Sequence, residues 1–143
     1  MYLFDEVDFV QTQNMPISDL WRFLPIGYLV TILIETPILL IGLTRKLSLK
    51  QRLLCGVWLT ACTYPIVVIV LPTMFQGYSR ASYLIVAEIF APVAECVIFW
   101  MAFRGRDFGN TDWIRSMIAI IVANLASFGL GEVIGYYRWF GLF

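Results

Sequence analysis

The chain contains no histidine among its 143 residues. This absence removes a common protein ligand for haem and zinc, and the side chain most often used as a general base near neutral pH. The sequence also lacks the motifs of P-loop proteins, zinc proteases and serine hydrolases. We therefore expect no cofactor and no enzymatic activity. The sequence leaves open whether a metal ion binds.

Charged residues are scarce, at 14% of the chain, whereas hydrophobic residues make up 60%. A soluble domain carries about 25% charged residues. The net charge is zero, which argues against nucleic-acid binding, because proteins that bind nucleic acids carry basic surfaces. The three cysteines form no CxxC pair, so the sequence predicts neither a disulfide framework nor a redox motif. This composition predicts an integral membrane protein whose first partner is the lipid bilayer.

The hydrophobic residues are grouped in long apolar runs, and the few charged residues lie mainly between them. A transmembrane helix needs roughly 20 mainly apolar residues. Four stretches meet this requirement, at residues 24–43, 53–75, 83–103 and 113–136. The predicted fold is all-α: residues 21–143 form an integral membrane four-helix bundle, preceded by an extramembrane segment over residues 1–20. That segment mixes apolar and acidic residues, and it is predicted to be a short surface helix or a tail.

Capping patterns support the starts of two spans. Ser48 followed by Gln51 matches a capping box ahead of the second span, and Thr111 with Asp112 is predicted to cap the fourth.

Basic residues are distributed unevenly between the two ends of these spans. The two short loops and the residues beside them carry Arg45, Lys46, Lys50, Arg52, Arg104 and Arg106. The opposite end carries Arg22, Arg80 and Arg138. Cytoplasmic loops of membrane proteins are enriched in lysine and arginine. The sequence therefore predicts that both short loops face the cytoplasm and that both termini lie outside.

Four glutamates lie inside the apolar spans, namely Glu35, Glu88, Glu95 and Glu132. A charged side chain at bilayer depth costs at least ~2.5 kcal/mol, so such acids are candidates for a functional site. No lysine, arginine or histidine is expected deep enough to neutralise them. They must then be protonated, hydrogen-bonded or paired with an external cation. Glu35 and Glu95 are predicted nearest the middle, with Glu88 and Glu132 forming a path from the outer surface.

The sequence also contains a candidate internal repeat. Placing Glu35 over Glu95 aligns the first and third spans, and the second and fourth then align with Thr60 over Asn124. Two copies of a helical hairpin would be related by a pseudo-twofold axis along the membrane normal. Chance similarity between apolar helices is the alternative. The repeat also aligns Thr63 with Ser127, so Thr60, Thr63, Asn124 and Ser127 are predicted to converge beside the acids, with Thr60, Thr63 and Asn124 as neutral ligands.

Small residues follow Asn124 at four-residue spacing. Ser127, Gly131 and Gly135 lie on one face of the fourth span. Such spacing lets two helices approach closely. We predict that these residues mark a close helix contact.

A short segment resembles a known family. Tyr78-Ser79-Arg80-Ala81 followed by Glu88-Ile89-Phe90-Ala91-Pro92 is similar to a segment of the membrane-associated glutathione and eicosanoid enzymes, which are four-helix proteins of similar length. The resemblance covers about fifteen residues and implies a glutathione- or lipid-type enzyme. That family carries the segment entering its second span, whereas here it falls in the third. The arginines with which the family grips glutathione have no counterpart in this chain.

Two hypotheses about function follow. The first is a small multi-pass membrane protein that binds or conducts a cation or proton at Glu35 and Glu95. The second is a structural or accessory subunit of a larger membrane complex, in which the acids are protonated or paired with basic residues of a partner. A bundle of four helices encloses little volume. We therefore expect a homo-oligomer or an assembly with other membrane subunits.

Overall fold

The computed structural model describes residues 17–136. It contains α2 (Ile17–Gly42), α3 (Leu49–Pro65), the π-helix η1 (Ile66–Val70), α4 (Leu71–Met74), α5 (Arg80–Phe103) and α6 (Asn110–Tyr136). Residues 17–136 contain no strand, so the all-α prediction is confirmed. The predicted extramembrane segment lies outside the described residues, except that its last four residues belong to α2.

Four helical segments are long and apolar enough to cross a membrane. They are Leu24–Gly42, Leu49–Met74, Arg80–Phe103 and Asn110–Ile134. These segments match the predicted spans closely, although the second, third and fourth begin three or four residues earlier than the apolar runs alone suggest. The chain is therefore an integral multi-pass membrane protein by the length and composition of its helices.

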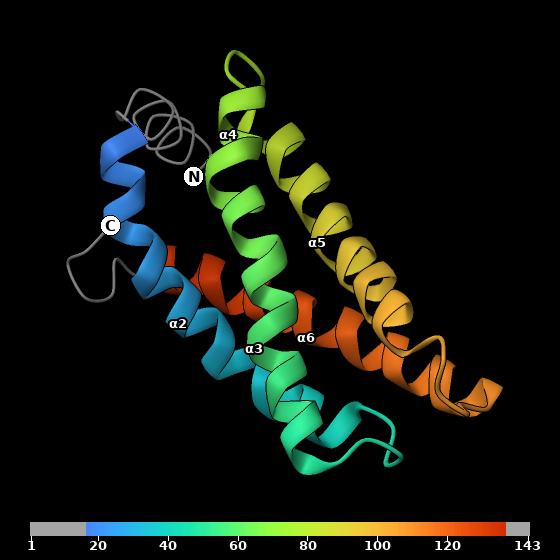
Figure 1. The fold of residues 1–143 in the computed structure, drawn as a ribbon. Coiled ribbons are helices and arrows are strands. Elements are labelled where there is room, and N and C mark those ends of the chain that lie inside the picture. Colours follow the sequence, from blue (N-terminus) through green and yellow to red (C-terminus); the bar gives the residue numbers. More distant parts are fainter. Residues whose placement is uncertain (1–16, 137–143) are drawn as a thin grey trace.

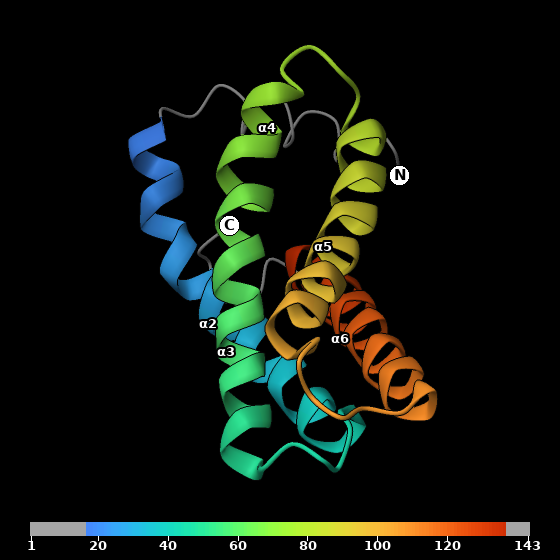
Figure 2. The same cartoon turned by 45° about the vertical axis from the view of Figure 1, so that its right-hand side comes forward.

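The helices form a four-cornered bundle, shown from two sides in Figure 1 and Figure 2. Both α2 and α5 pack against α3 and α6. The loops at residues 43–48 and 104–109 lie together at one end, here called the loop end. The start of α2, the turn at residues 75–79 and the end of α6 lie at the other end, here called the terminal end. The four spans therefore alternate in direction.

Local capping sets the helix starts. Ser48 accepts a hydrogen bond from the Gln51 amide at 3.3 Å, and the Gln51 side chain accepts one from the Ser48 amide at 3.0 Å. This pair is the predicted capping box. The prediction for α6 is wrong in its position: that helix begins before Thr111, and Asp112 lies in its first turn and accepts from the amide of residue 109 at 3.1 Å.

The π-helix η1 follows from a proline. In η1 the Leu71 amide donates to the Ile66 carbonyl, five residues back. Pro72 has no amide hydrogen, so the next carbonyl, that of Val67, cannot receive the corresponding bond. The Tyr83 hydroxyl on α5 donates to the Val67 carbonyl instead, at 3.1 Å. A side chain from a neighbouring helix thus satisfies the backbone group that Pro72 leaves unpaired.

The apolar core lies towards the loop end. It consists of Leu39, Leu43, Leu47, Cys55, Leu59, Phe99, Ala119, Ile120 and Ala123. Four aromatic rings contact one another beside it, with centroid distances of 4.8 Å for Phe99–Phe103, 6.1 Å for Phe103–Phe108 and 5.1 Å for Phe108–Trp113. Trp113 returns to Phe99 at 6.0 Å. Through Phe108, the loop at residues 104–109 therefore packs against rings of α5 and α6.

Two arginines complete the C-terminal end of α2. The last carbonyls of a helix have no partner within the helix, and positive charge near them is stabilising. Arg115 on α6 donates to the carbonyls of Gly42 and Ile41, each at 2.9 Å. Arg52 on α3 donates to the Leu40 carbonyl at 3.1 Å. Both neighbouring helices therefore hold the end of α2.

A polar clamp joins the two loops. Lys46 forms an ion pair with Asp112 at 3.2 Å and donates to the Asp107 carbonyl at 2.6 Å. The Thr44 hydroxyl donates to Asp112 at 2.5 Å, and its amide donates to Ser116 at 3.2 Å.

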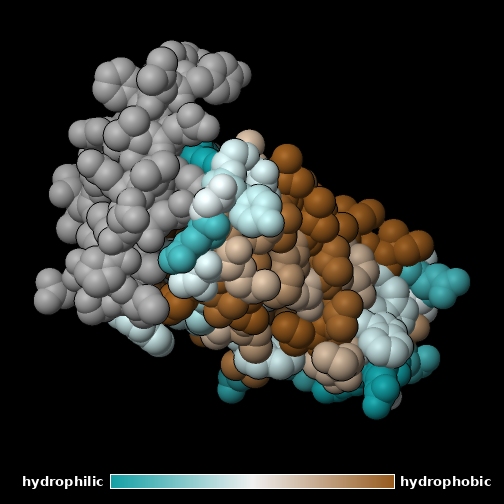
Figure 3. Space-filling model, turned by 90° about the horizontal axis from the view of Figure 1, so that it is seen from above, coloured by the Kyte–Doolittle hydropathy of each residue, from teal (hydrophilic) through white to brown (hydrophobic). Residues whose placement is uncertain are grey.

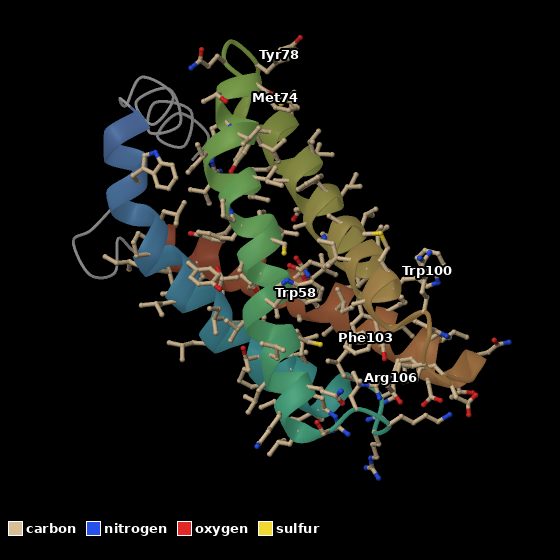
Figure 4. All side chains as sticks on the ribbon, in the orientation of Figure 1. Trp58, Met74, Tyr78, Trp100, Phe103 and Arg106 are labelled. Carbon is tan, nitrogen blue, oxygen red and sulfur yellow. The ribbon has the colours of Figure 1, made fainter. Side chains whose placement is uncertain are left out.

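The outer surface of the bundle is apolar. Hydrophobic side chains cover much of the coloured surface in Figure 3. Figure 4 shows Trp100 pointing away from α5, with Met74 and Tyr78 at the terminal end and Arg106 at the loop end. Large apolar side chains such as Leu33, Ile41 and Ile89 are also exposed. Such a surface suits a lipid environment, in which apolar exposure carries no cost.

Candidate functional site: a carboxyl pair inside the bundle

Two of the four intramembrane glutamates are buried at the centre of the bundle. Glu35 on α2 is 2% exposed and Glu95 on α5 is 1% exposed. They lie on opposite corners of the bundle, since α2 and α5 each pack between α3 and α6. The two carboxyl groups are near enough to interact electrostatically. The prediction that both acids point into the bundle is confirmed.

Each acid is hydrogen-bonded by side chains from both neighbouring helices. For Glu35, Oε2 lies 2.6 Å from the Thr60 hydroxyl on α3, and Oε1 lies 2.6 Å from the Ser127 hydroxyl on α6. For Glu95, Oε1 lies 2.7 Å from the Thr63 hydroxyl on α3. Its Oε2 lies 2.8 Å from Nδ2 of Asn124 on α6.

Helix periodicity places these four partners. Thr60 and Thr63 are three residues apart on α3, and Asn124 and Ser127 are three apart on α6, so each pair lies on one helix face. Glu35 and Glu95 bridge the two faces. The six side chains form a closed ring through all four long helices, here called the carboxyl ring and defined by Glu35, Thr60, Thr63, Glu95, Asn124 and Ser127.

Ser127 had two predicted roles, as the repeat partner of Thr63 beside the acids and as part of a close helix contact, and it lies in the ring. The prediction grouped it with Gly131 and Gly135 as a close helix contact. A Cβ added at Gly131 would meet no described atom within 4 Å, so the predicted close contact is not made at Gly131 among the described residues. The close approaches occur elsewhere, at Gly42 against Ala119 and at Gly56 against Thr36. The sequence signal for its place in the ring is its alignment with Thr63 in the candidate repeat.

The hydrogen bonds of the ring follow a twofold pattern. Glu35 bonds Thr60 within its own hairpin and Ser127 in the other hairpin. Glu95 bonds Asn124 within its own hairpin and Thr63 in the other. Exchanging the two hairpins therefore exchanges these bonds in pairs. The pattern agrees with the aligned residues, while a tandem duplication of the hairpin stays a prediction.

The other two acids lie outside the ring. Glu132 on α6 pairs with Arg80 at the start of α5, at 2.7 Å and 2.9 Å from its two carboxyl oxygens. The expectation that no basic residue reaches these acids is therefore wrong for Glu132. The arginine lies at the terminal end, where the third span begins earlier than its apolar run. Glu88 is half-buried, and its carboxyl has no hydrogen bond to the described residues.

The ring presents oxygen and amide groups and no histidine or thiolate. Within residues 17–136, no group of three acidic, cysteine or histidine side chains is arranged to hold a metal ion. Thr36, beside Glu35 in sequence, has a buried hydroxyl oxygen without a hydrogen-bond partner among the described residues. Chemically, the arrangement can hold a proton on either acid and can solvate either carboxylate with neutral donors.

Comparison with protein-family models, with curated proteins and with solved structures finds no match to this chain. The resemblance of residues 78–92 to the glutathione and eicosanoid enzymes therefore receives no support from a family model.

Proposed function

We propose that this chain is a small membrane protein that binds and exchanges a proton or another cation at Glu35 and Glu95. The observation that carries the proposal is the carboxyl ring, in which two acids from α2 and α5 are surrounded by four neutral partners from α3 and α6. No basic residue belongs to this ring among the described residues. An acid without a built-in cation at this depth needs a proton or an external cation for neutrality.

The direction of exchange follows from the packing around the ring. The apolar core and the aromatic rings occupy the loop side of the site. Towards the terminal end lie polar groups that include Tyr83, Arg80 and Glu132. We propose that the site exchanges its cation through the terminal end. The positive-inside rule predicts that this end lies outside the cytoplasm.

Binding of this kind requires one chain, since a single bundle completes the ring. Conduction across the whole membrane would need a second path past the core, and we propose that a homo-oligomer or another membrane subunit would supply it. The second candidate function, an accessory subunit of a larger complex, is favoured by the open surface at Gly129 and Gly131. A Cβ at either position meets no described atom within 4 Å, and small exposed residues allow close helix approach in membranes.

Thermal unfolding tests cation binding. The protein in lipid nanodiscs is unfolded over a range of pH and, separately, with Na⁺, K⁺, Mg²⁺ or Ca²⁺ added. We expect acid or one of these cations to raise the unfolding temperature of the wild type. Glu35→Gln and Glu95→Gln should each abolish the increase while keeping the fold, because glutamine preserves volume and hydrogen bonding. Glu88→Gln is the matched control and should respond like the wild type.

An equal response in all variants would contradict the proposal and favour a structural role for the ring. Purification then separates the two candidate functions. A stable homo-oligomer or monomer in detergent favours a self-contained site, whereas other membrane proteins retained at fixed stoichiometry favour an accessory subunit.

A further inference from the structure

The polar groups around Glu95 make more contacts than they have hydrogen atoms to donate. Thr63 Oγ1 lies 2.7 Å from Glu95 Oε1 and 3.2 Å from the Leu59 carbonyl. Asn124 Nδ2 lies 2.8 Å from Glu95 Oε2 and 3.0 Å from the Ile120 carbonyl. The hydroxyl has one hydrogen and the amide has two, so these three hydrogens serve four polar contacts. A proton on Glu95 supplies the fourth.

The proton has one favourable position on Glu95. Oε2 faces the Asn124 amide, which can only donate at that nitrogen. Oε1 faces a hydroxyl, which can accept from the acid and donate its own hydrogen to the Leu59 carbonyl. All four contacts are then satisfied when the proton lies on Oε1.

Glu35 also has fewer donor hydrogens around it than polar contacts, but its protonated form is arranged differently. Its partner Thr60 also lies 2.8 Å from the Gly56 carbonyl, and Ser127 lies 3.0 Å from the Asn124 carbonyl. Two hydroxyl hydrogens serve four contacts, and a proton on Glu35 raises the number of hydrogens to three. That proton can lie on either oxygen, because both face hydroxyls. Glu35 therefore has two equivalent protonated arrangements, whereas Glu95 has one.

We infer that the cation held by the ring is a proton on Oε1 of Glu95, with the Thr63 hydroxyl as its switching partner. This inference rests on the proposed function and names its ligand. In the neutral state the Glu95 proton is donated to Thr63, and Thr63 donates to the Leu59 carbonyl. When the proton leaves to water, the Thr63 hydroxyl turns and donates to Oε1. One proton is lost from Glu95, and Thr63 keeps its own hydrogen.

The surroundings of Glu95 favour a proton over a metal ion. All four carboxyl oxygens of the two acids already have a protein partner at 2.6–2.8 Å. A metal ion would have to displace these partners to reach the carboxyl oxygens. The titratable groups facing Glu95 are Glu35 from α2 and Cys96 from its own helix. The neighbouring helices α3 and α6 contribute neutral Thr63 and Asn124.

Infrared spectroscopy of the protein in lipid vesicles tests the inference. A protonated carboxyl group has a C=O stretching band that is separate from the carboxylate bands and shifts in D₂O. We expect this band in the wild type at neutral pH, and we expect Glu95→Gln to remove the Glu95 component. Thr63→Val should keep the band but shift it, because the acid proton loses its acceptor. Thr63→Ser should restore the wild-type position, and Glu88→Gln should leave the component in place.

Three results would overturn the inference: no protonated-acid band at neutral pH, a band that survives Glu95→Gln unchanged, or a band that Thr63→Val does not shift in folded protein. The thermal experiment keeps the two proposals distinguishable. Carboxylate bands that move on adding a metal cation, together with stabilisation by that cation, would retain the proposed function and reject the proton. A protein that responds to neither pH nor cations would reject both.

Discussion

The two halves of the bundle are held together differently. On the loop side of the carboxyl ring, a continuous apolar core, four contacting aromatic rings and two arginines on the end of α2 fix the helices. On the terminal side, beyond this core, the described contacts include an Arg80–Glu132 ion pair and a Tyr83 hydroxyl that donates to the Val67 carbonyl of η1. Prolines interrupt the regular backbone pairing there.

The difference gives the ring a defined setting. It lies at the edge of the apolar core, and in our proposal water reaches it from the terminal end. Helix irregularities of the kind seen at η1 are frequent at functional sites. The comparison predicts that mutations in the two halves should differ in their effects on stability and on exchange.

The largest effect on stability should come from the loop half. Phe99 is 0% exposed and contacts both Phe103 and Trp113. Phe99→Ala should lower the free energy of unfolding by about 3 kcal/mol, as truncation of a buried aromatic residue does. Ile89→Ala, on the exposed surface of the same helix, is the control and should change it by less than about 0.5 kcal/mol. Equal losses in both variants would show that the buried aromatic cluster contributes no more to stability than the exposed surface does.

A smaller effect is expected at the ring. Glu35→Ala removes the partner of two hydroxyls and leaves a cavity, which should cost about 2 kcal/mol of unfolding free energy. Glu35→Gln should cost less than about 1 kcal/mol, because the amide retains an oxygen acceptor and similar volume. Steric-trap or denaturant unfolding in bicelles measures both. A glutamine variant as unstable as the alanine variant would indicate that the negative charge itself stabilises the bundle.

The ion pair at the terminal end should contribute least to stability. The Arg80 and Glu132 side chains are 26% and 40% exposed, and exposed pairs contribute about 0.2–1 kcal/mol. A double-mutant cycle with Arg80→Gln and Glu132→Gln should give a coupling energy within that range, falling as salt is added. A coupling energy above about 2 kcal/mol would contradict the expectation that this exposed pair contributes little to stability.

Cysteine labelling tests which side of the membrane the loop end faces. The substitutions that it needs should change stability little. Single cysteines at Ser48 and Asn110, in a background with Cys55, Cys62 and Cys96 replaced, should resist an impermeant thiol reagent in intact cells. The positive-inside rule predicts that both positions face the cytoplasm. Ready labelling from outside would reverse the orientation and place the exchanging end of the ring inside the cell.

Much of the architecture was predictable, because a helix that crosses the bilayer requires a long apolar run that is easily recognised in the sequence. Four apolar runs of sufficient length indicate four helices, and Ser48 with Gln51 indicates where α3 begins. Depth alone also indicates that Glu35 and Glu95 point inward. Arg80 as the partner of Glu132 was not predicted, since that pair joins residues 52 positions apart and depends on where α5 begins.

The hydrogen-bond partners within the carboxyl ring were harder to predict, because they too join residues that are far apart in the sequence. Spacing places Thr60 and Thr63 on one helix face, but which hydroxyl reaches which acid depends on helix rotation. The repeat alignment therefore placed Ser127 beside the acids without showing that its hydroxyl reaches Glu35. The π-helix likewise required knowing that Tyr83 lies opposite the Val67 carbonyl.

Proton titration of the folded protein tests the central claim most directly. The double variant Glu35→Gln/Glu95→Gln is titrated against the wild type, with Glu88→Gln as the control. We predict that the wild type and Glu88→Gln take up an additional proton near neutral pH, where Glu95 becomes the donor to Thr63, and that the double variant does not. Superimposable curves near neutral pH, with the additional uptake confined to the range of an exposed glutamate at about pH 4.3, would contradict it.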